Sequence, residues 1–290
     1  MKLLARTALQ YYVRHFPVSR GKNRLISALW KPLSFGQYQC QTTLSQARLK
    51  INCDLTQNIQ RNIYFWGNYE PEYCEYWIKF ARHSRVVFDI GANVGVYSLL
   101  AAAVNPKASI HAFEPTPAIF DMLTKNIRLN DLRNIHTNAV GVGSRSGRAI
   151  LRECRGSNGA NEGMNFVVNN ALKTDDSDLP IPLTSLDDYC GEVKIDQIDI
   201  IKMDIEGGEY AALQGARKLL QEQAIKCIFL ELTEWAANRS GHSTIDIKRI
   251  LREAGYRIYQ LDAGKLSEDK SEGINESGNV LAFARDFTFS

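Results

Sequence analysis

The stretch VVFDIGANVGVYS (residues 86–98) decides the fold of this 290-residue chain. Its first five residues are apolar apart from Asp89 and form a short buried strand. Gly91 and Gly95 then interrupt the chain, and an apolar helical run begins near Val94. A glycine at position 91 permits a sharp turn and lets a ligand approach the backbone. The stretch predicts the first strand, loop and helix of a doubly wound α/β sheet, in which ligands bind beyond the carboxyl ends of the strands.

Outward from this stretch, short apolar runs alternate with segments of helical periodicity. Such strands, separated by helices, predict a mostly parallel sheet covered on both faces. The last two strands have no helix between them and fit a hairpin, whose second strand runs antiparallel to its neighbour. The expected strands are RVVFDI (85–90), SIHAFEP (109–115), NIHTNAV (134–140), IDIIKMD (198–204), CIFLELT (227–233), YRIYQLD (256–262) and NVLAFAR (279–285).

The chain before the sheet has a different character. We predict a basic, mostly helical N-terminal extension over residues 1–83 and a ligand-binding domain over residues 84–290. Within the extension, apolar residues at helical spacing predict one helix that ends at Gly67 and a second that begins at Pro71. A segment rich in Asn, Gly, Asp and Ser at 155–182 is either a substrate-facing loop or an insertion without a role in binding.

The net charge of +3 hides an asymmetry along the chain. Residues 1–53 contain nine basic and no acidic side chains, whereas the rest carries a net charge of −6. A basic leader can be a solvated helical extension, or it can dock on anionic lipid, nucleic acid or a phosphorylated substrate. Peripheral membrane contact through residues 1–53 is therefore one expectation.

Composition excludes several classes of protein. The chain is 44% hydrophobic and 23% charged, unlike collagen, disordered chains or disulfide scaffolds. No apolar run is long enough to span a membrane, and Arg6 and Arg14 interrupt any signal-peptide core. The six cysteines form no C-x-x-C or Cys/His cluster, so a zinc site is not expected. They predict reduced thiols in a cytoplasmic protein.

The loop at 91–95 does not match phosphate-rich cofactors. A dinucleotide fingerprint requires glycines where this chain has Asn93 and Val96, and no P-loop lysine follows. Asp89, two residues before Gly91, repels pyrophosphate but suits a ligand with an ammonium group, such as S-adenosylmethionine. Asn93 is expected to cap the following helix.

The ends of the next two strands add polar groups to the same edge. Glu114 ends the second strand, where its carboxylate can accept both hydroxyls of a ribose. Asn138 ends the third, where it can bond the edge of an adenine while the backbone of Ala139 packs on the ring. The predicted cofactor-binding residues are Asp89, Gly91, Asn93, Gly95, Glu114, Asn138 and Ala139.

On these residues the sequence resembles class I S-adenosylmethionine-dependent methyltransferases, and more narrowly the FkbM family. The motifs that carry the resemblance are FDIGANVGVYS, FEPTP, NAVGVGSRSG, IPLTSLDDY and IDIIKMDIEGGEYAALQGA. The resemblance implies a seven-stranded sheet whose last strand is antiparallel. It also implies S-adenosylmethionine as cofactor and methyl transfer to an oxygen of a sugar or natural-product scaffold.

A hydroxyl acceptor has to lose its proton, which requires a base or a metal. Asp204 ends the fourth strand and is the first candidate for general base or metal ligand; its alternative role is to cap the next helix. Lys202 and Glu231 are charged residues inside apolar strands, and we predict that they pair across neighbouring strands near the active site. Glu209 is more typical of a first-turn helix acid. Mg²⁺ is conceivable at these acids, but no spacing identifies a metal site.

Three functions stay open at this point. The first is an O-methyltransferase acting on a saccharide or related small-molecule acceptor. The second is an RNA or nucleotide methyltransferase, although no aromatic and basic stacking platform is present in the sheet region and nucleic acid is not the expected partner. The third is a non-catalytic protein with a methyltransferase fold that docks through its basic N-terminus. The sequence does not specify the oligomeric state.

Overall fold

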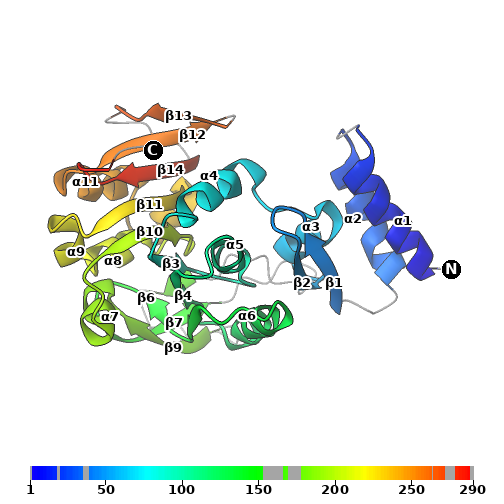
Figure 1. Ribbon diagram of the computed structural model, residues 1–290, viewed down its shortest axis with the longest axis horizontal. Helices are drawn as coiled ribbons and strands as arrows, with labels where there is room; N and C mark the ends of the chain where they lie inside the picture. The colour runs from blue at the N-terminus through cyan, green and yellow to red at the C-terminus, as the bar shows by residue number, and fades with distance from the viewer. Residues whose placement is uncertain are drawn as a thin grey trace.

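A central sheet with helices on both faces forms the body of the molecule (Figure 1). The computed structural model describes residues 2–17, 20–34, 39–152, 166–168, 178–262, 264–271 and 278–287. Over these residues the sheet has eight strands in the order β13-β12-β14-β11-β10-β3-β4-β5. Their bounds are β3 (Val86–Ile90), β4 (Ser109–Phe113), β5 (Ile135–Asn138), β10 (Ile198–Met203), β11 (Ile225–Leu232), β12 (Arg257–Asp262), β13 (Lys265–Glu268) and β14 (Gly278–Phe283).

The predicted mostly parallel α/β sheet is confirmed. Strands β11, β10, β3, β4 and β5 are parallel to their neighbours in this order, and β14 runs antiparallel to both β11 and β12. An eighth strand, β13, extends the seven predicted strands at one edge by pairing with β12. It is short and polar (KLSE), so it carries no apolar alternation from which a strand can be predicted.

Helices cover the sheet because side chains alternate between its two faces. On one face, residues such as Val87, Ile200 and Phe229 pack with α4, α5 and α6; on the other, Phe88, Ile201 and Leu230 pack with α7, α8, α9 and α11. The helices of this body are α4 (Pro71–Ala81), α5 (Val96–Val104), α6 (Pro117–Leu129), α7 (Leu186–Val193), α8 (Glu209–Gln214), α9 (Arg217–Gln221), α10 (Glu234–Arg239) and α11 (Thr244–Glu253).

The residues before the sheet form helices as predicted, and also a β-hairpin that was not predicted. Helix α3 (Asn58–Trp66) ends at Gly67 with a positive φ of 71°, and Pro71 occupies the first turn of α4. Strands β1 (Gln39–Leu44) and β2 (Leu49–Asp54) pair antiparallel. Helices α1 (Lys2–His15) and α2 (Lys22–Ser34) complete this part. No helix in the described part of the chain combines the length and apolarity needed to cross a bilayer.

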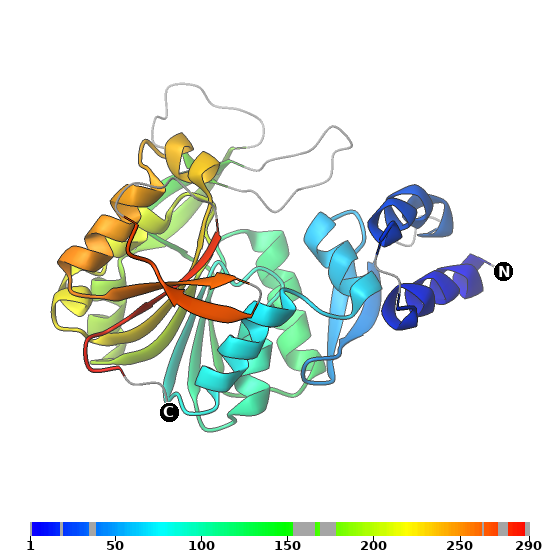
Figure 2. The ribbon, with the colours of Figure 1, turned by 90° about the horizontal axis from the view of Figure 1, so that it is seen from above.

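Helix α4 belongs physically to the sheet, although it comes from the predicted extension. Trp77 is fully buried, donates a hydrogen bond to the Tyr97 carbonyl at 2.9 Å, and has its ring 5.3 Å from that of Phe229. Tyr73 is 5.1 Å from the same ring. The hairpin is tied to α6 as well, because Asn126 Oδ1 accepts a hydrogen bond from the Asn52 amide at 2.8 Å. In both ribbon views, α1 and α2 lie at the end of the molecule farthest from β12 and β13 (Figures 1 and 2).

A smaller sheet lies beside the carboxyl edge of the main one. In the described residues it has the order β6-β9-β7-β8, with β6 (Gly141–Val142), β7 (Gly147–Arg152), β8 (Phe166–Val168) and β9 (Asp178–Thr184). The segment 155–182, expected to be a loop or insertion, contributes β8 and most of β9 to this sheet. Its remaining residues lie outside the described ranges.

Candidate functional site

Two strand-end loops touch at the carboxyl edge of the main sheet, and Gly91 makes their contact possible. Gly91 follows β3 with a φ of 80°, and a Cβ there would lie 2.0 Å from the carbonyl oxygen of Asp204, which follows β10. The amides of Gly91 and Ala92 both donate to the Phe113 carbonyl, at 3.0 and 2.9 Å. Gly91 therefore holds three adjacent strand ends together, which places any ligand there across β4, β3 and β10.

Glu114 is fixed at this edge by the backbone around it. One carboxylate oxygen accepts a hydrogen bond from the Asn93 amide at 3.1 Å, and the other accepts one from the Thr116 amide at 2.8 Å. Burial raises the pKa of Glu114, and these amide bonds oppose the rise. The Thr116 side chain also bonds to this carboxylate, so of about four acceptor positions one remains for a hydroxyl group of a ligand.

A cavity of about 670 Å³ opens beside Glu114. One wall consists of the strand-end loops, and the opposite wall comes from the smaller sheet. A mostly apolar cavity with a few polar groups is typical of a small-molecule site. Its lining includes Ile90, Gly91, Asn93, Phe113, Glu114, Thr116, Ile119, Val140, Val142, Leu151, Ile181, Leu183, Asp204 and Glu206.

A second, smaller cavity adjoins the first through four shared residues: Gly91, Asn93, Asp204 and Glu206. Its other walls come from the first turn of α5 and from the segment before the sheet. Ile59 of α3 and Tyr69, which precedes α4, line it together with Tyr97 of α5. The two cavities therefore meet at Asp204 and Glu206, which makes these two carboxyl groups the centre of the site.

Below this centre lies a buried lysine in an acidic and aromatic surrounding. The Lys202 side chain is 1% exposed, and its Nζ lies 3.1 Å from Asp204 Oδ2. The rings of Tyr73 and Tyr97 lie 5.5 and 5.0 Å from Nζ. Burial lowers the pKa of Lys202, but Asp204, Glu70 and Glu231 together raise it by more, so the ammonium stays charged. Lys202 thus holds Asp204 in place from inside the sheet.

The acids around Lys202 retain protons at unusually high pH. Burial raises the pKa of Glu231 to about 8; Asp204 adds to this effect and Lys202 opposes it. Burial likewise raises the pKa of Glu206 to about 7, again with a contribution from Asp204. Groups that exchange protons near neutral pH are suited to acid–base work, although structural clusters produce similar shifts.

Glu70, from the segment before the sheet, joins this cluster. It accepts a hydrogen bond from the Tyr97 hydroxyl, and it occupies a left-handed backbone conformation with a φ of 37°. Burial raises the pKa of Glu70, while Lys202 and the Tyr97 hydroxyl oppose the rise. In the part of the chain that the structure describes, no group of three or more His, Cys, Asp or Glu side chains is arranged to hold a metal ion.

The predicted pair between Lys202 and Glu231 was wrong. The register places Lys202 opposite Phe229 on β11, two residues short of Glu231, and the observed ion pair is with Asp204 on the same strand. Positions 202 and 204 point to the same face of the sheet, which lets these two side chains meet. Glu231 still acts on Lys202 electrostatically.

Asp89 lies under the site rather than in its lining. Its carboxylate is 1% exposed and accepts hydrogen bonds from the Ser98 amide and hydroxyl at 2.8 and 2.6 Å. Burial raises the pKa of Asp89 to about 6, and the bonds from Ser98 oppose the rise. Both bonds go to Oδ2 and anchor the strand to α5, and contact between Asp89 and a ligand's ammonium group stays a prediction.

The other predicted cofactor residues divide between lining and support. Gly91, Asn93 and Glu114 line the cavities, whereas Gly95, Asn138 and Ala139 are absent from both linings. A Cβ at Gly95 would lie 2.6 Å from Leu123, so this glycine admits α6. The side-chain amide of Asn138 donates to the carbonyls of Ala112 and His136, each at 3.2 Å, and the chain meets the cavity two residues later, at Val140.

The prediction that Asn93 caps α5 was also wrong. Gly95 is the residue before the helix, and the Asn93 side chain accepts a hydrogen bond from the next amide, Val94, at 2.8 Å. Asn93 has a φ of 50°, which its short polar side chain tolerates. Glu209, by contrast, acts as expected of a helix-start acid: it accepts hydrogen bonds from the amides of Ile205 and Gly207.

Several lining residues were missed at the level of sequence. Tyr69 and Ile59 come from the segment before the sheet, and Leu183 from the smaller sheet, so nothing local relates them to the loop at Gly91. Glu206 had a local signal, because two glycines follow it; in the structure its own φ is 52°. A charged residue held in that conformation at a strand end indicates a constrained site.

Comparison with known proteins identifies related sequences. The methyltransferase FkbM domain matches residues 89–258. Methyltransferase sdnD of Sordaria araneosa is 30% identical over 153 residues, which cover 44% of this chain and 59% of that protein. The 2-O-methyltransferase NoeI of Sinorhizobium fredii is 26% identical over 144 residues, covering 47% and 58%. The hexuronic acid methyltransferase AglP of Haloferax volcanii is 26% identical over 175 residues, covering 60% and 64%. The chain thus spans less than two thirds of each of these relatives.

Proposed function

The chain belongs to the FkbM methyltransferase family, and on that basis we propose that it transfers a methyl group from S-adenosylmethionine to a hydroxyl oxygen of a saccharide or of a related metabolite. The names of two relatives support an oxygen nucleophile on a sugar, since one is a 2-O-methyltransferase and the other a hexuronic acid methyltransferase. The observation that carries the proposal is the pair of joined cavities that meet at Asp204, with Glu114 in the wall of the larger one.

The residues of the larger cavity fit an adenosyl group. Phe113, Ile119 and Leu183 offer apolar surface to a flat ring, and the remaining acceptor position of Glu114 suits a ribose hydroxyl. Pyrophosphate would be repelled by Glu114, Asp204 and Glu206, which surround the same space. The smaller cavity, beside the first turn of α5, fits the amino-acid end of the cofactor.

The chemistry then centres on Asp204. When bound, S-adenosylmethionine supplies a methyl group that its sulfonium charge has already activated. The Asp204 carboxylate, 25% exposed and held by Lys202, orients the acceptor hydroxyl and accepts its proton. Glu206 and Glu231 can share that proton near neutral pH, because their pKa values are about 7 and 8. Lys202 is a positioning residue, since it is buried and lines neither cavity.

Thermal shift with S-adenosylhomocysteine tests the cofactor site. The ligand should raise the Tm of the protein progressively as its concentration exceeds the Kd, whereas NAD should not. In Glu114→Gln, loss of a charged hydrogen-bond acceptor should weaken binding by about tenfold or more. Glu72→Gln, at an exposed position of α4, is the matched control and should bind S-adenosylhomocysteine as the wild type does. No shift at millimolar ligand in the wild type would contradict the proposal.

Asp204→Asn tests the base. The variant keeps the size of the side chain but removes its ability to take a proton, so turnover with saccharide acceptors should fall about a hundredfold or more. Affinity for S-adenosylhomocysteine should change little, and the exposed Asp121→Asn should behave as wild type. Release of S-adenosylhomocysteine from S-adenosylmethionine measures turnover. Unchanged turnover in Asp204→Asn would exclude it as the base.

A further inference from the structure

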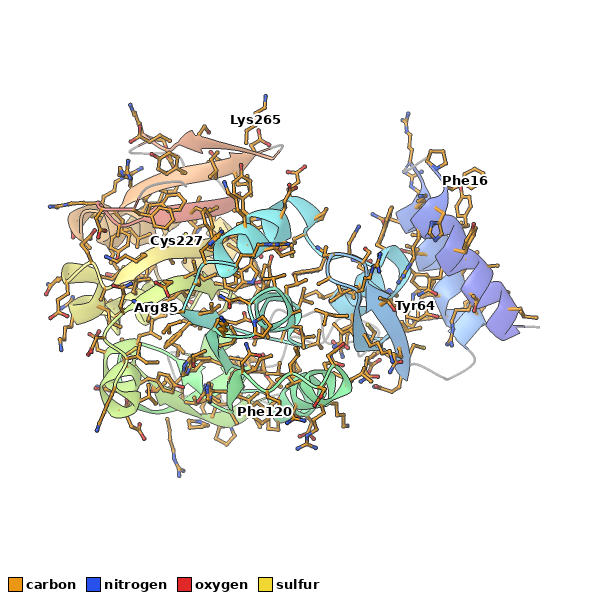
Figure 3. All side chains as sticks on the ribbon, in the orientation of Figure 1. Phe16, Tyr64, Arg85, Phe120, Cys227 and Lys265 are labelled. Atoms are coloured by element: carbon orange, nitrogen blue, oxygen red, sulfur yellow. The ribbon has the colours of Figure 1, made fainter. Side chains whose placement is uncertain are left out.

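The outer surface of α1 and α2 exposes apolar side chains that the fold does not use. Among the described residues, six large apolar side chains are more than a third exposed, and four of them lie on or next to these two helices. Figure 3 shows Phe16 at the outer edge of this helix pair and Tyr64 where the pair meets the rest of the chain. The four are Leu4 (74%), Tyr11 (68%), Phe16 (56%) and Leu25 (37%), which we call the outer apolar patch.

Folding does not account for this patch, because the opposite faces of the same helices supply the core. Leu9 and Val13 of α1 and Ile26 and Trp30 of α2 are buried. Leu4 and Tyr11 are seven residues apart and so share one side of α1, about opposite to Leu9 and Val13. A surface helix normally places polar residues on its solvent side. The outer apolar patch therefore indicates a surface that a membrane or another molecule covers.

The charge around the patch has a single sign. Residues 1–53 contain no Asp or Glu, and three of their basic side chains serve inside the fold. Lys22 donates to the carbonyls of Val13 and Phe16 at 2.6 Å, Arg14 donates to the Tyr64 carbonyl at 2.8 Å, and Arg6 is 7% exposed. Three others are exposed on the same helical segment: Arg20 between the two helices in sequence, and Arg24 and Lys31 on α2.

We propose that the outer apolar patch and these three cations dock the protein on the surface of an anionic lipid bilayer. Leucine and aromatic side chains enter the boundary between headgroups and acyl chains, and each cation near an anionic surface adds electrostatic attraction. A second copy of the chain would bring two positive surfaces together, which is unfavourable. A nucleic acid would satisfy the cations but would offer little apolar surface to Leu4 and Leu25.

Cosedimentation of the full-length protein with vesicles tests this proposal. Binding is expected to vesicles that contain phosphatidylglycerol with phosphatidylcholine, and it should weaken as salt is added. Vesicles of phosphatidylcholine alone should bind poorly. The substitutions Arg24→Glu and Lys31→Glu together should weaken binding by at least about tenfold, since they reverse two charges. Leu4→Ser with Tyr11→Ser should weaken it as well, by removing apolar insertion.

The control variant combines Val193→Ser and Trp235→Ser, which remove exposed apolar side chains elsewhere on the molecule and should leave vesicle binding unchanged. Every substituted position is exposed, and the Tm of each variant checks its fold. Equal binding of wild type and the Arg24/Lys31 variant would overturn the proposal. So would salt-sensitive binding to RNA without binding to vesicles, or self-association that the Leu4/Tyr11 variant abolishes while vesicle binding is absent throughout.

Discussion

A methyl group at position 91 would lie 2.0 Å from the carbonyl oxygen of Asp204, on a backbone whose φ is 80°. Gly91→Ala therefore has to separate the ends of β3 and β10 or strain the loop between them. We expect a loss of unfolding free energy of about 2 kcal/mol or more, measured by urea denaturation. Gly191→Ala is the control, because its Cβ meets no atom within 4 Å; it should be near neutral. Equal stability of both variants would show that the loops do not touch as described.

Glu231 makes stability depend on pH. Its pKa rises from an ordinary 4.5 in the unfolded chain to about 8 in the fold, mainly through burial. Between these two pKa values the folded protein binds more protons than the unfolded chain. The free energy of unfolding therefore falls with rising pH, and the contribution of protonated Glu231 is lost as the pH rises through about 8. The Tm of wild type should fall more steeply between acidic and mildly alkaline pH than that of Glu231→Gln.

A control variant for the pH dependence of Tm has to retain the acids around Lys202. Glu75→Gln, on an exposed position of α4, should keep the wild-type dependence of Tm on pH. Parallel curves for wild type and Glu231→Gln would mean that Glu231 is ionised in the folded protein, and a role in sharing the substrate proton near neutral pH would then be excluded.

At the scale of elements, α4 is the part of the N-terminal segment that the sheet requires. Trp77→Ala removes a fully buried ring that contacts Tyr97 and Phe229, and it leaves the Tyr97 carbonyl without this donor. We expect a loss of about 3–5 kcal/mol in thermal or urea unfolding. Trp235→Ala, at a ring that is 51% exposed, should cost far less. Similar losses in the two variants would mean that α4 does not pack on the sheet.

Elements differ in how far the sequence predicts them. The strand and helix around Gly91 follow from apolar runs and turn residues, and α3 and α4 follow from helical spacing ended by Gly67 and begun by Pro71. The edge strand β13 and the hairpin β1–β2 do not follow in this way. β1 and β13 are polar or only partly apolar, so they carry little of the alternation that predicts a strand. β2 (LKINCD) does alternate and pairs with β1 across a short turn, and this local signal was missed.

At the scale of the whole molecule, the site and the outer apolar patch lie on different parts of the fold. Hydrogen exchange should record this separation: S-adenosylhomocysteine should slow exchange of the amides in the loops at 91–97, 114–116 and 140–142. Amides of α1 and α2 should exchange at the same rate with and without it. Protection confined to α1 and α2 would place the ligand elsewhere.

Local periodicity and conformational freedom were enough to predict seven strands of the main sheet with the helices between them, the glycine at the first strand end, and the acids at the ends of β4 and β10. Which polar groups from separate segments meet depends on tertiary contacts. Packing of α5 on β3 brought Ser98 to Asp89, and packing of other segments brought Tyr69, Glu70 and Leu183 to the same edge as Asp204. Contacts between segments far apart in the chain depend on how whole elements pack, and no local pattern of residues records that packing.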